Sequence, residues 1–185
     1  MKQIRILIVD DDNVNPYGSV ETLKRNILQA FSQEASFAEF EPELVVIAPG
    51  EGEVWEWNQE YIDRGLEAIQ TQHFDICFFD WNVGTMTSAS EQDNLYTDEL
   101  ILKAQEMGIL FRIISGSGIS LIRFFEKYRE LHLEEKFFLK PYGLNDANAY
   151  GVTDIVNVLA EALGRRAKER DPEKRDDGGN SRLIK

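Results

Sequence analysis

Six polar residues stand at the ends of four apolar runs of the sequence, and their types suit one kind of chemistry: Asp10, Asp11, Asp12, Asp80, Ser115 and Lys140. Carboxylates that meet at one place repel one another unless a cation lies between them, and oxygen-liganded Mg²⁺ suits carboxylates that leave room for bound water. An ammonium and a hydroxyl beside them would neutralise and hold a phosphoryl group, whose charge is spread over three oxygens. A carboxylate can itself be the nucleophile in such a transfer and form an acyl phosphate.

The apolar runs before these residues predict strands, and helical patterns lie between the strands. We expect strands over residues 4–9, 44–48, 75–79, 109–114 and 137–139, and helices over about residues 20–31, 62–69, 96–107, 119–128 and 152–163. Because parallel strands need crossover helices, this alternation indicates an α/β fold, a doubly wound five-stranded parallel sheet with helices on both faces. Ligands bind beyond the carboxyl ends of such strands, so the six polar residues should converge there.

Each of these residues has a more ordinary explanation when it is taken alone. An acid after a strand is more often a helix cap or a turn residue. A serine before glycine, or a lysine before proline, usually marks only a turn. The four matching residue types, in the right order at four strand ends, favour a common site.

Length and composition narrow the functions that the chain can have. Its 185 residues allow one well-buried domain, and a net charge of −13 argues against broad binding to nucleic acid. No apolar run approaches the roughly 20 residues that span a bilayer. The single cysteine, Cys77, lies in an apolar run and is expected to be a core residue of a protein from a reducing compartment. We therefore expect a cytoplasmic protein that contacts neither membranes nor nucleic acid directly.

Residues 1–166 are expected to form the domain, and residues 167–185, with charges of both signs, a flexible C-terminal tail. Two connections, residues 49–58 and 81–95, are longer than most in compact domains. Trp81 opens the second of them. It is interpreted either as a gate over the site or as an ordinary half-buried aromatic residue.

Over roughly residues 4–164 the sequence resembles the receiver domains of two-component response regulators. The motifs that carry the resemblance are ILIVDDD ending at Asp12, FDICFFD ending at Asp80, RIISG ending at Gly116 and FFLKPYG beginning at Phe137. The resemblance implies the flavodoxin-like or CheY-like strand order 2-1-3-4-5. It also implies that Asp80 accepts a phosphoryl group from a sensor histidine kinase or a phosphotransfer protein.

The same resemblance implies roles for the other site residues. Asp10 and Asp11 would hold Mg²⁺ together with Asp80 and the main-chain carbonyl of Asn82. The side chains of Ser115 and Lys140 would bind the phosphoryl oxygens.

Phe137 matches the aromatic residue that changes rotamer as the hydroxyl residue of the switch, here Ser115, moves. The implied protein is a stand-alone phosphorylation switch rather than a metabolic enzyme. Its output would be contact with a downstream protein, or a homodimer. The sequence departs from the family after Asp80, where the usual proline is missing and Trp81 leads into the long loop.

Two other functions stay open. A haloacid-dehalogenase-type phosphatase would use Asp10 as its nucleophile, with Asp12 and Val14 in its first motif and Ser115 and Lys140 in later ones. It would need a further acidic pair, which the sequence beyond Lys140 does not offer in a suitable place. The other alternative is a receiver-like interaction module that no longer depends on phosphorylation.

Overall fold

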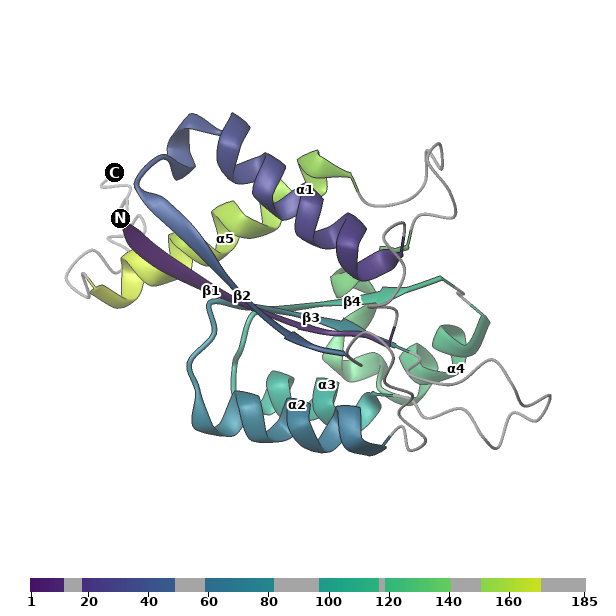
Figure 1. The fold of residues 1–185 in the computed structure, drawn as a ribbon. Helices are drawn as coiled ribbons and strands as arrows, with labels where there is room; N and C mark the ends of the chain where they lie inside the picture. Colours follow the sequence, from purple (N-terminus) through teal and green to yellow (C-terminus); the bar gives the residue numbers. More distant parts are fainter. Residues whose placement is uncertain (12–17, 49–58, 82–96, 117–118, 141–150, 171–185) are drawn as a thin grey trace, which may run out of the picture.

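The computed structural model describes residues 1–11, 18–48, 59–81, 97–116, 119–140 and 151–170. Five parallel strands form one sheet in the order β2-β1-β3-β4-β5, with helices on both faces (Figure 1). The strands are β1 (Lys2–Val9), β2 (Phe40–Ile47), β3 (Ile76–Asp80), β4 (Phe111–Ser115) and β5 (Phe137–Leu139). The predicted doubly wound fold and its strand order are confirmed.

The helices alternate with the strands along the chain. They are α1 (Ser19–Gln33), α2 (Gln59–Thr71), α3 (Asp98–Glu106), α4 (Ile119–Lys127) and α5 (Val152–Arg170), with short 3-10 turns at Ala35–Phe37, Arg129–Leu131 and Leu133–Lys136. Helices α1 and α5 lie on one face of the sheet, and α2 and α3 lie on the other (Figure 1). Within the part of the chain described, no helix combines the length and the apolar character that crossing a membrane requires.

The strand β1 separates two hydrophobic cores. Ile4, Ile6 and Ile8 pack in the core beneath α1 and α5, whereas Leu7 and Val9 pack in the core on the side of α2 and α3. Side chains alternate between the faces of a strand, and here both faces are covered. For this reason the sequence of β1 is entirely apolar from Ile6 to Val9.

Strand β3 is buried along its whole length. It contains Cys77, which is a free, buried cysteine whose thiol has its pKa raised by burial. The prediction that Cys77 is a core residue is confirmed. A strand buried in this way holds its last residue, Asp80, in a fixed position relative to β1 and β4.

Some predicted boundaries and orientations were wrong. Strand β2 begins at Phe40 rather than at residue 44, because it is an edge strand and tolerates Pro42 and its charged neighbours. Leu28, an apolar residue inside the helix predicted over residues 20–31, does not face the core and is 52% exposed. Helix α3 stops where it was predicted to, beside Gly108, whose φ of 69° lies in the left-handed region that favours glycine.

The last helix continues past the predicted end at residue 163. It ends at Arg170, so the first residues of the expected tail, 167–170, are helical. The rest of that tail and the long connections 49–58 and 82–95 lie outside the described residues.

Candidate functional site

The carboxyl ends of four neighbouring strands bring five of the six predicted polar residues, all except Asp12, which lies outside the described residues, to one edge of the sheet. Asp80 ends β3 and lies opposite Ile114, Ser115 ends β4, and Lys140 follows β5 directly. The backbone N–H of Lys140 donates to the carbonyl of Ser115 at 2.9 Å, which continues the pairing of β4 with β5. Asp10 continues β1, and its side chain is fully buried.

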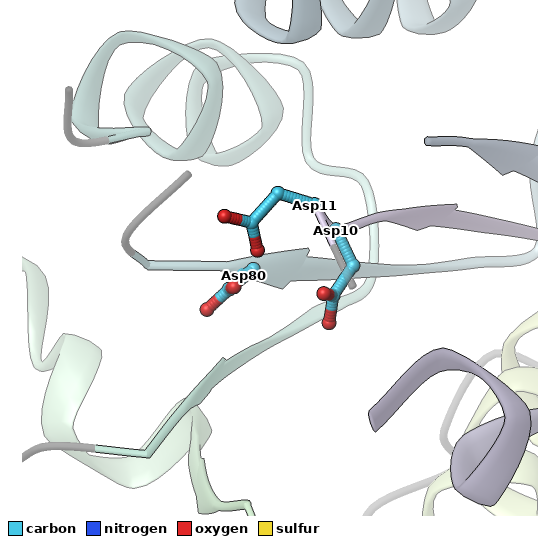
Figure 2. Close-up of side chains that lie close together, drawn as sticks. All are labelled: Asp10, Asp11 and Asp80. Carbon is cyan, nitrogen blue, oxygen red and sulfur yellow. The ribbon is translucent and has the colours of Figure 1, made fainter. Parts of the chain in front are cut away.

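Three carboxylates form an acidic cluster at this edge. Asp10, Asp11 and Asp80 each present one oxygen, and these oxygens all lie within 4.8 Å of one another (Figure 2). Asp10 and Asp80 are buried, and Asp11 is partly exposed. A set of anionic oxygens at this spacing can hold a metal ion, and oxygen ligands suit hard divalent cations.

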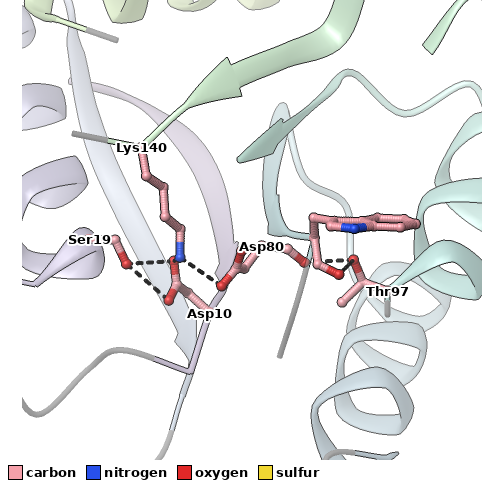
Figure 3. Close-up of polar contacts among 6 residues, drawn as sticks. Asp10, Ser19, Asp80, Thr97 and Lys140 are labelled. Carbon is pink, nitrogen blue, oxygen red and sulfur yellow. Dashed lines mark hydrogen bonds and ion pairs between the residues drawn. The ribbon is translucent and has the colours of Figure 1, made fainter. Parts of the chain in front are cut away.

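Lys140 lies between two of the three carboxylates (Figure 3). Its Nζ is 2.7 Å from Oδ2 of Asp80 and 2.9 Å from Oδ2 of Asp10, and 13% of its side chain is exposed. Burial by itself would lower the pKa of Lys140, but the charges of Asp80 and Asp10 outweigh it and raise the pKa. Lys140 is therefore a firmly charged ammonium that ties the end of β5 to β1 and β3.

One ammonium among three carboxylates leaves the cluster with excess negative charge. Burial, and then the charge of Asp10, raise the pKa of Asp80 well above its ordinary value, against the opposing effect of Lys140. Burial and the charge of Asp10 also raise the pKa of Asp11 to about 6. A bound divalent cation would remove this repulsion, so the electrostatics of the cluster favour a metal ion as its partner.

Ser19, the first residue of α1, belongs to the site although the sequence analysis did not select it. It is 9% exposed, and its hydroxyl lies 2.9 and 3.1 Å from the two carboxylate oxygens of Asp10 (Figure 3). A serine before an apolar helical stripe was a visible signal, but it indicates a helix cap rather than a partner for Asp10. Ser19 and Lys140 together fix the orientation of the Asp10 carboxylate.

Thr97, just before α3, is a second residue that the sequence analysis missed. It is fully buried, and its Oγ1 lies 2.6 Å from the carbonyl oxygen of Asp80, 17 positions earlier in the chain (Figure 3). No sequence signal could have found this contact, because the intervening residues follow no pattern that brings Thr97 back to the end of β3.

Trp81 is neither a gate over the site nor half-buried. It is 3% exposed, and its ring centroid lies 4.3 Å from that of Phe124 in α4. Its backbone N–H donates to the carbonyl of Ile114 at 2.8 Å, so the pairing of β3 with β4 continues through Trp81 and carries the indole into the core.

The structure describes Ser115 and Phe137 among the remaining predicted residues, whereas Asn82, Asp12 and Val14 lie outside the described residues. Ser115 is 3% exposed at the end of β4. Phe137, at the start of β5, is partly buried, and its ring centroid lies 6.3 Å from that of Phe125 in α4. Asn82, whose carbonyl was expected to bind the metal, lies outside the described residues, as do Asp12 and Val14 of the phosphatase alternative.

Comparisons with known proteins add little to this geometry. No protein-family model and no curated protein matches the chain. Among solved structures it is similar to the FeoB G-domain from Methanococcus jannaschii, with 19% identity over 89% of this chain and 99% of that one, at a TM-score of 0.38. An AraC family transcriptional regulator from Pseudomonas putida is 9% identical over 89% of this chain and 92% of that one, at a TM-score of 0.33. Neither likeness is close enough to indicate a function.

Proposed function

We propose that the chain is a phospho-accepting receiver domain in which Asp80 is the phosphorylated residue. The observation that carries this proposal is the ion pair of Lys140 with Asp80, 2.7 Å long, inside a cluster of acids at the carboxyl edge of a parallel sheet. The donor would be a sensor histidine kinase or a phosphotransfer protein. The metal would be Mg²⁺, held by Asp10, Asp11 and Asp80.

In the proposed reaction a carboxylate oxygen of Asp80 attacks the phosphorus of a phosphohistidine. The P–N bond breaks, the imidazole leaves with the bonding electron pair and takes up a proton, and an acyl phosphate remains on Asp80. Lys140 is within reach to neutralise a phosphoryl oxygen, and Mg²⁺ would supply the remaining positive charge. Asp10 is held by Ser19 and Lys140, so it orients the lysine rather than acting as the nucleophile.

A phosphoryl group on Asp80 would change the partners of Lys140 and offer a new acceptor to the hydroxyl of Ser115. A shift of a two-state equilibrium from 1:99 to 99:1 needs about 5.5 kcal/mol. A hydrogen bond to a charged group contributes roughly 1.5–3 kcal/mol, so at least two such bonds are needed. The change would reach a protein-binding surface through α4, because Phe125 of that helix contacts Phe137. The output would be binding of a downstream protein or of a second copy of the chain.

The proposal is tested with Mg²⁺ and acetyl phosphate, a small phosphodonor, followed by intact mass. We expect the parent protein and the control Asp63→Asn, which changes an exposed acid of α2, to gain one phosphoryl group. Asp80→Asn should gain none, because it lacks the nucleophile. Omitting Mg²⁺ should greatly slow the reaction of the parent.

The same experiment separates the alternatives. Phosphate found on Asp10, with Asp80→Asn still reactive, would indicate the phosphatase. A parent protein that binds Mg²⁺ but takes up no phosphoryl group from acetyl phosphate or phosphoramidate would indicate an interaction module that does not use phosphorylation.

A further inference from the structure

Thr97 stands at the N-terminus of α3 but does not use its side chain for that helix. A threonine in this position usually accepts a hydrogen bond from a backbone N–H of the first turn, which stabilises the helix. The side chain of Thr97 makes no such bond. Its hydroxyl lies instead 2.6 Å from the carbonyl oxygen of Asp80 and 3.4 Å from that of Trp81 (Figure 3).

The contacts of Thr97 fix one particular peptide group. The carbonyl of Asp80 and the N–H of Trp81 belong to the same peptide plane. The carbonyl accepts from the Thr97 hydroxyl, and the N–H donates to Ile114 of β4 at 2.8 Å. This peptide is thus held from both sides, directly after the carboxylate that faces Lys140.

The sheet alone would hold the peptide on one side only. The pairing of β1 with β3 ends at Val9 and Phe79, so beyond it Asp80 has β4 as a strand neighbour but no longer β1. Thr97 takes the place of the missing strand, and its own N–H also donates to the carbonyl of Trp81 at 3.1 Å. Thr97 therefore joins the end of β3 to the start of α3 through both its side chain and its backbone.

We propose that Thr97 is a positioning residue, which orients the Asp80 carboxylate toward Lys140 and the metal by locking the peptide that follows Asp80. The inference rests on the proposed function of Asp80. Thr97 touches neither the phosphoryl group nor the metal in this account. It acts through the backbone, since without this bond the end of β3, and with it the Asp80 side chain, could shift relative to Lys140.

The test compares Thr97→Val, which keeps the shape and loses the hydroxyl, with Thr97→Ser, which keeps the hydroxyl. Each variant is assayed for Mg²⁺ affinity by calorimetry and for the rate of phosphorylation by acetyl phosphate, at a temperature where circular dichroism shows it folded. We expect Thr97→Val to lose about 10- to 100-fold in one or both, the loss typical of an ångström-scale displacement of a reacting group. Thr97→Ser should stay near the parent.

A control separates positioning from a general loss of stability. Asp75→Ala removes a buried carboxylate at the opposite edge of the sheet and should destabilise the fold without changing Mg²⁺ affinity or rate. Parent values of both quantities in folded Thr97→Val would overturn the proposal. If Thr97→Val does not fold, Thr97→Ala replaces it, because alanine also lacks the hydroxyl and is smaller; parent values in that variant would overturn it equally.

The outcome for Thr97 is distinguishable from the outcome for the proposed function. A parent protein that is phosphorylated on Asp80, beside a Thr97→Val variant that reacts just as fast, contradicts only the role of Thr97. A parent protein that is never phosphorylated contradicts the proposed function. In that case the Mg²⁺ affinity of Thr97→Val, compared with the affinity of the parent, still reports whether Thr97 orients Asp80.

Discussion

Asp11 is a residue of the acidic cluster whose raised pKa predicts a pH dependence of the site. Burial and the charge of Asp10 raise its pKa from 3.8 to about 6 in the folded protein. The folded state therefore binds more protons than the unfolded state between these two pH values. The contribution of Asp11 to the stability of the metal-free protein should fall as the pH rises through this window and should then level off.

Metal binding should have the opposite pH dependence, because a metal ion binds the carboxylate and displaces the proton. We expect the Mg²⁺ affinity to increase from pH 5 to pH 7, the range in which Asp11 loses its proton. Calorimetric titrations across this range measure the affinity. An affinity that does not change between pH 5 and 7 would mean that Asp11 does not bind the ion.

Asp11→Asn should separate stability from function. The substitution removes one of three repelling carboxylates, so the metal-free variant at pH 7 should melt at a temperature at least about 2 °C higher, since 1 kcal/mol corresponds to roughly 2–4 °C in a chain of this length. It should also lose most of its Mg²⁺ affinity. Asp63→Asn is the matched control, because it removes the same charge from an exposed position and should leave both properties near the parent values. A lower melting temperature in Asp11→Asn would contradict the account of repulsion.

At the scale of elements, Asp75 holds β1 and β3 together near the amino-terminal end of β3, at the opposite end of the strand from the site. Its N–H donates to the carbonyl of Arg5 at 2.9 Å, and its carboxylate accepts from the N–H of Arg5 at 2.8 Å. Regular pairing of the two strands starts only at Ile6 and Ile76. Asp75 therefore extends the ladder by one residue, using its side chain as one of the acceptors.

Removing this acceptor should weaken the pairing. We expect Asp75→Ala to lower the free energy of unfolding by about 1–3 kcal/mol, because the N–H of Arg5 loses its buried acceptor. Asp75→Asn should lose less, since its amide oxygen can still accept. Urea unfolding followed by circular dichroism measures both, and a parent-like midpoint for Asp75→Ala would show that water replaces the carboxylate.

The whole molecule carries a net charge of −13, and the acidic cluster adds local repulsion to this global excess. Added KCl should therefore raise the melting temperature of the metal-free protein modestly, because salt screens repulsion between charges more than about 8 Å apart at physiological ionic strength. MgCl₂ at the same ionic strength should raise it further. A ligand that binds only the folded state stabilises it by about 2.7 kcal/mol at 100 times its dissociation constant.

The comparison of the two salts distinguishes screening from binding. In Asp11→Asn the additional effect of MgCl₂ over KCl should largely disappear, whereas the effect of KCl should remain. Differential scanning calorimetry of both proteins in matched buffers gives the four melting temperatures. An equal response of the parent to both salts would argue against a specific metal site.

The sequence by itself determined the layers of the fold and the edge at which the site forms. Strands buried on both faces must be apolar almost throughout, so β1 and β3 are visible as runs that end in acids. Parallel strands joined by helices bring their carboxyl ends to one edge, and this places Asp10, Asp80 and Lys140 together without further information.

Only the tertiary structure decided how these groups are held. Ser19 bonds to Asp10, Thr97 bonds to the backbone of Asp80, and Trp81 is drawn into the core against Phe124. Periodicity in a sequence reports which side of a strand or helix is covered. It carries no information about which side chains from distant segments meet, because those meetings depend on how the finished layers pack and where each connection returns.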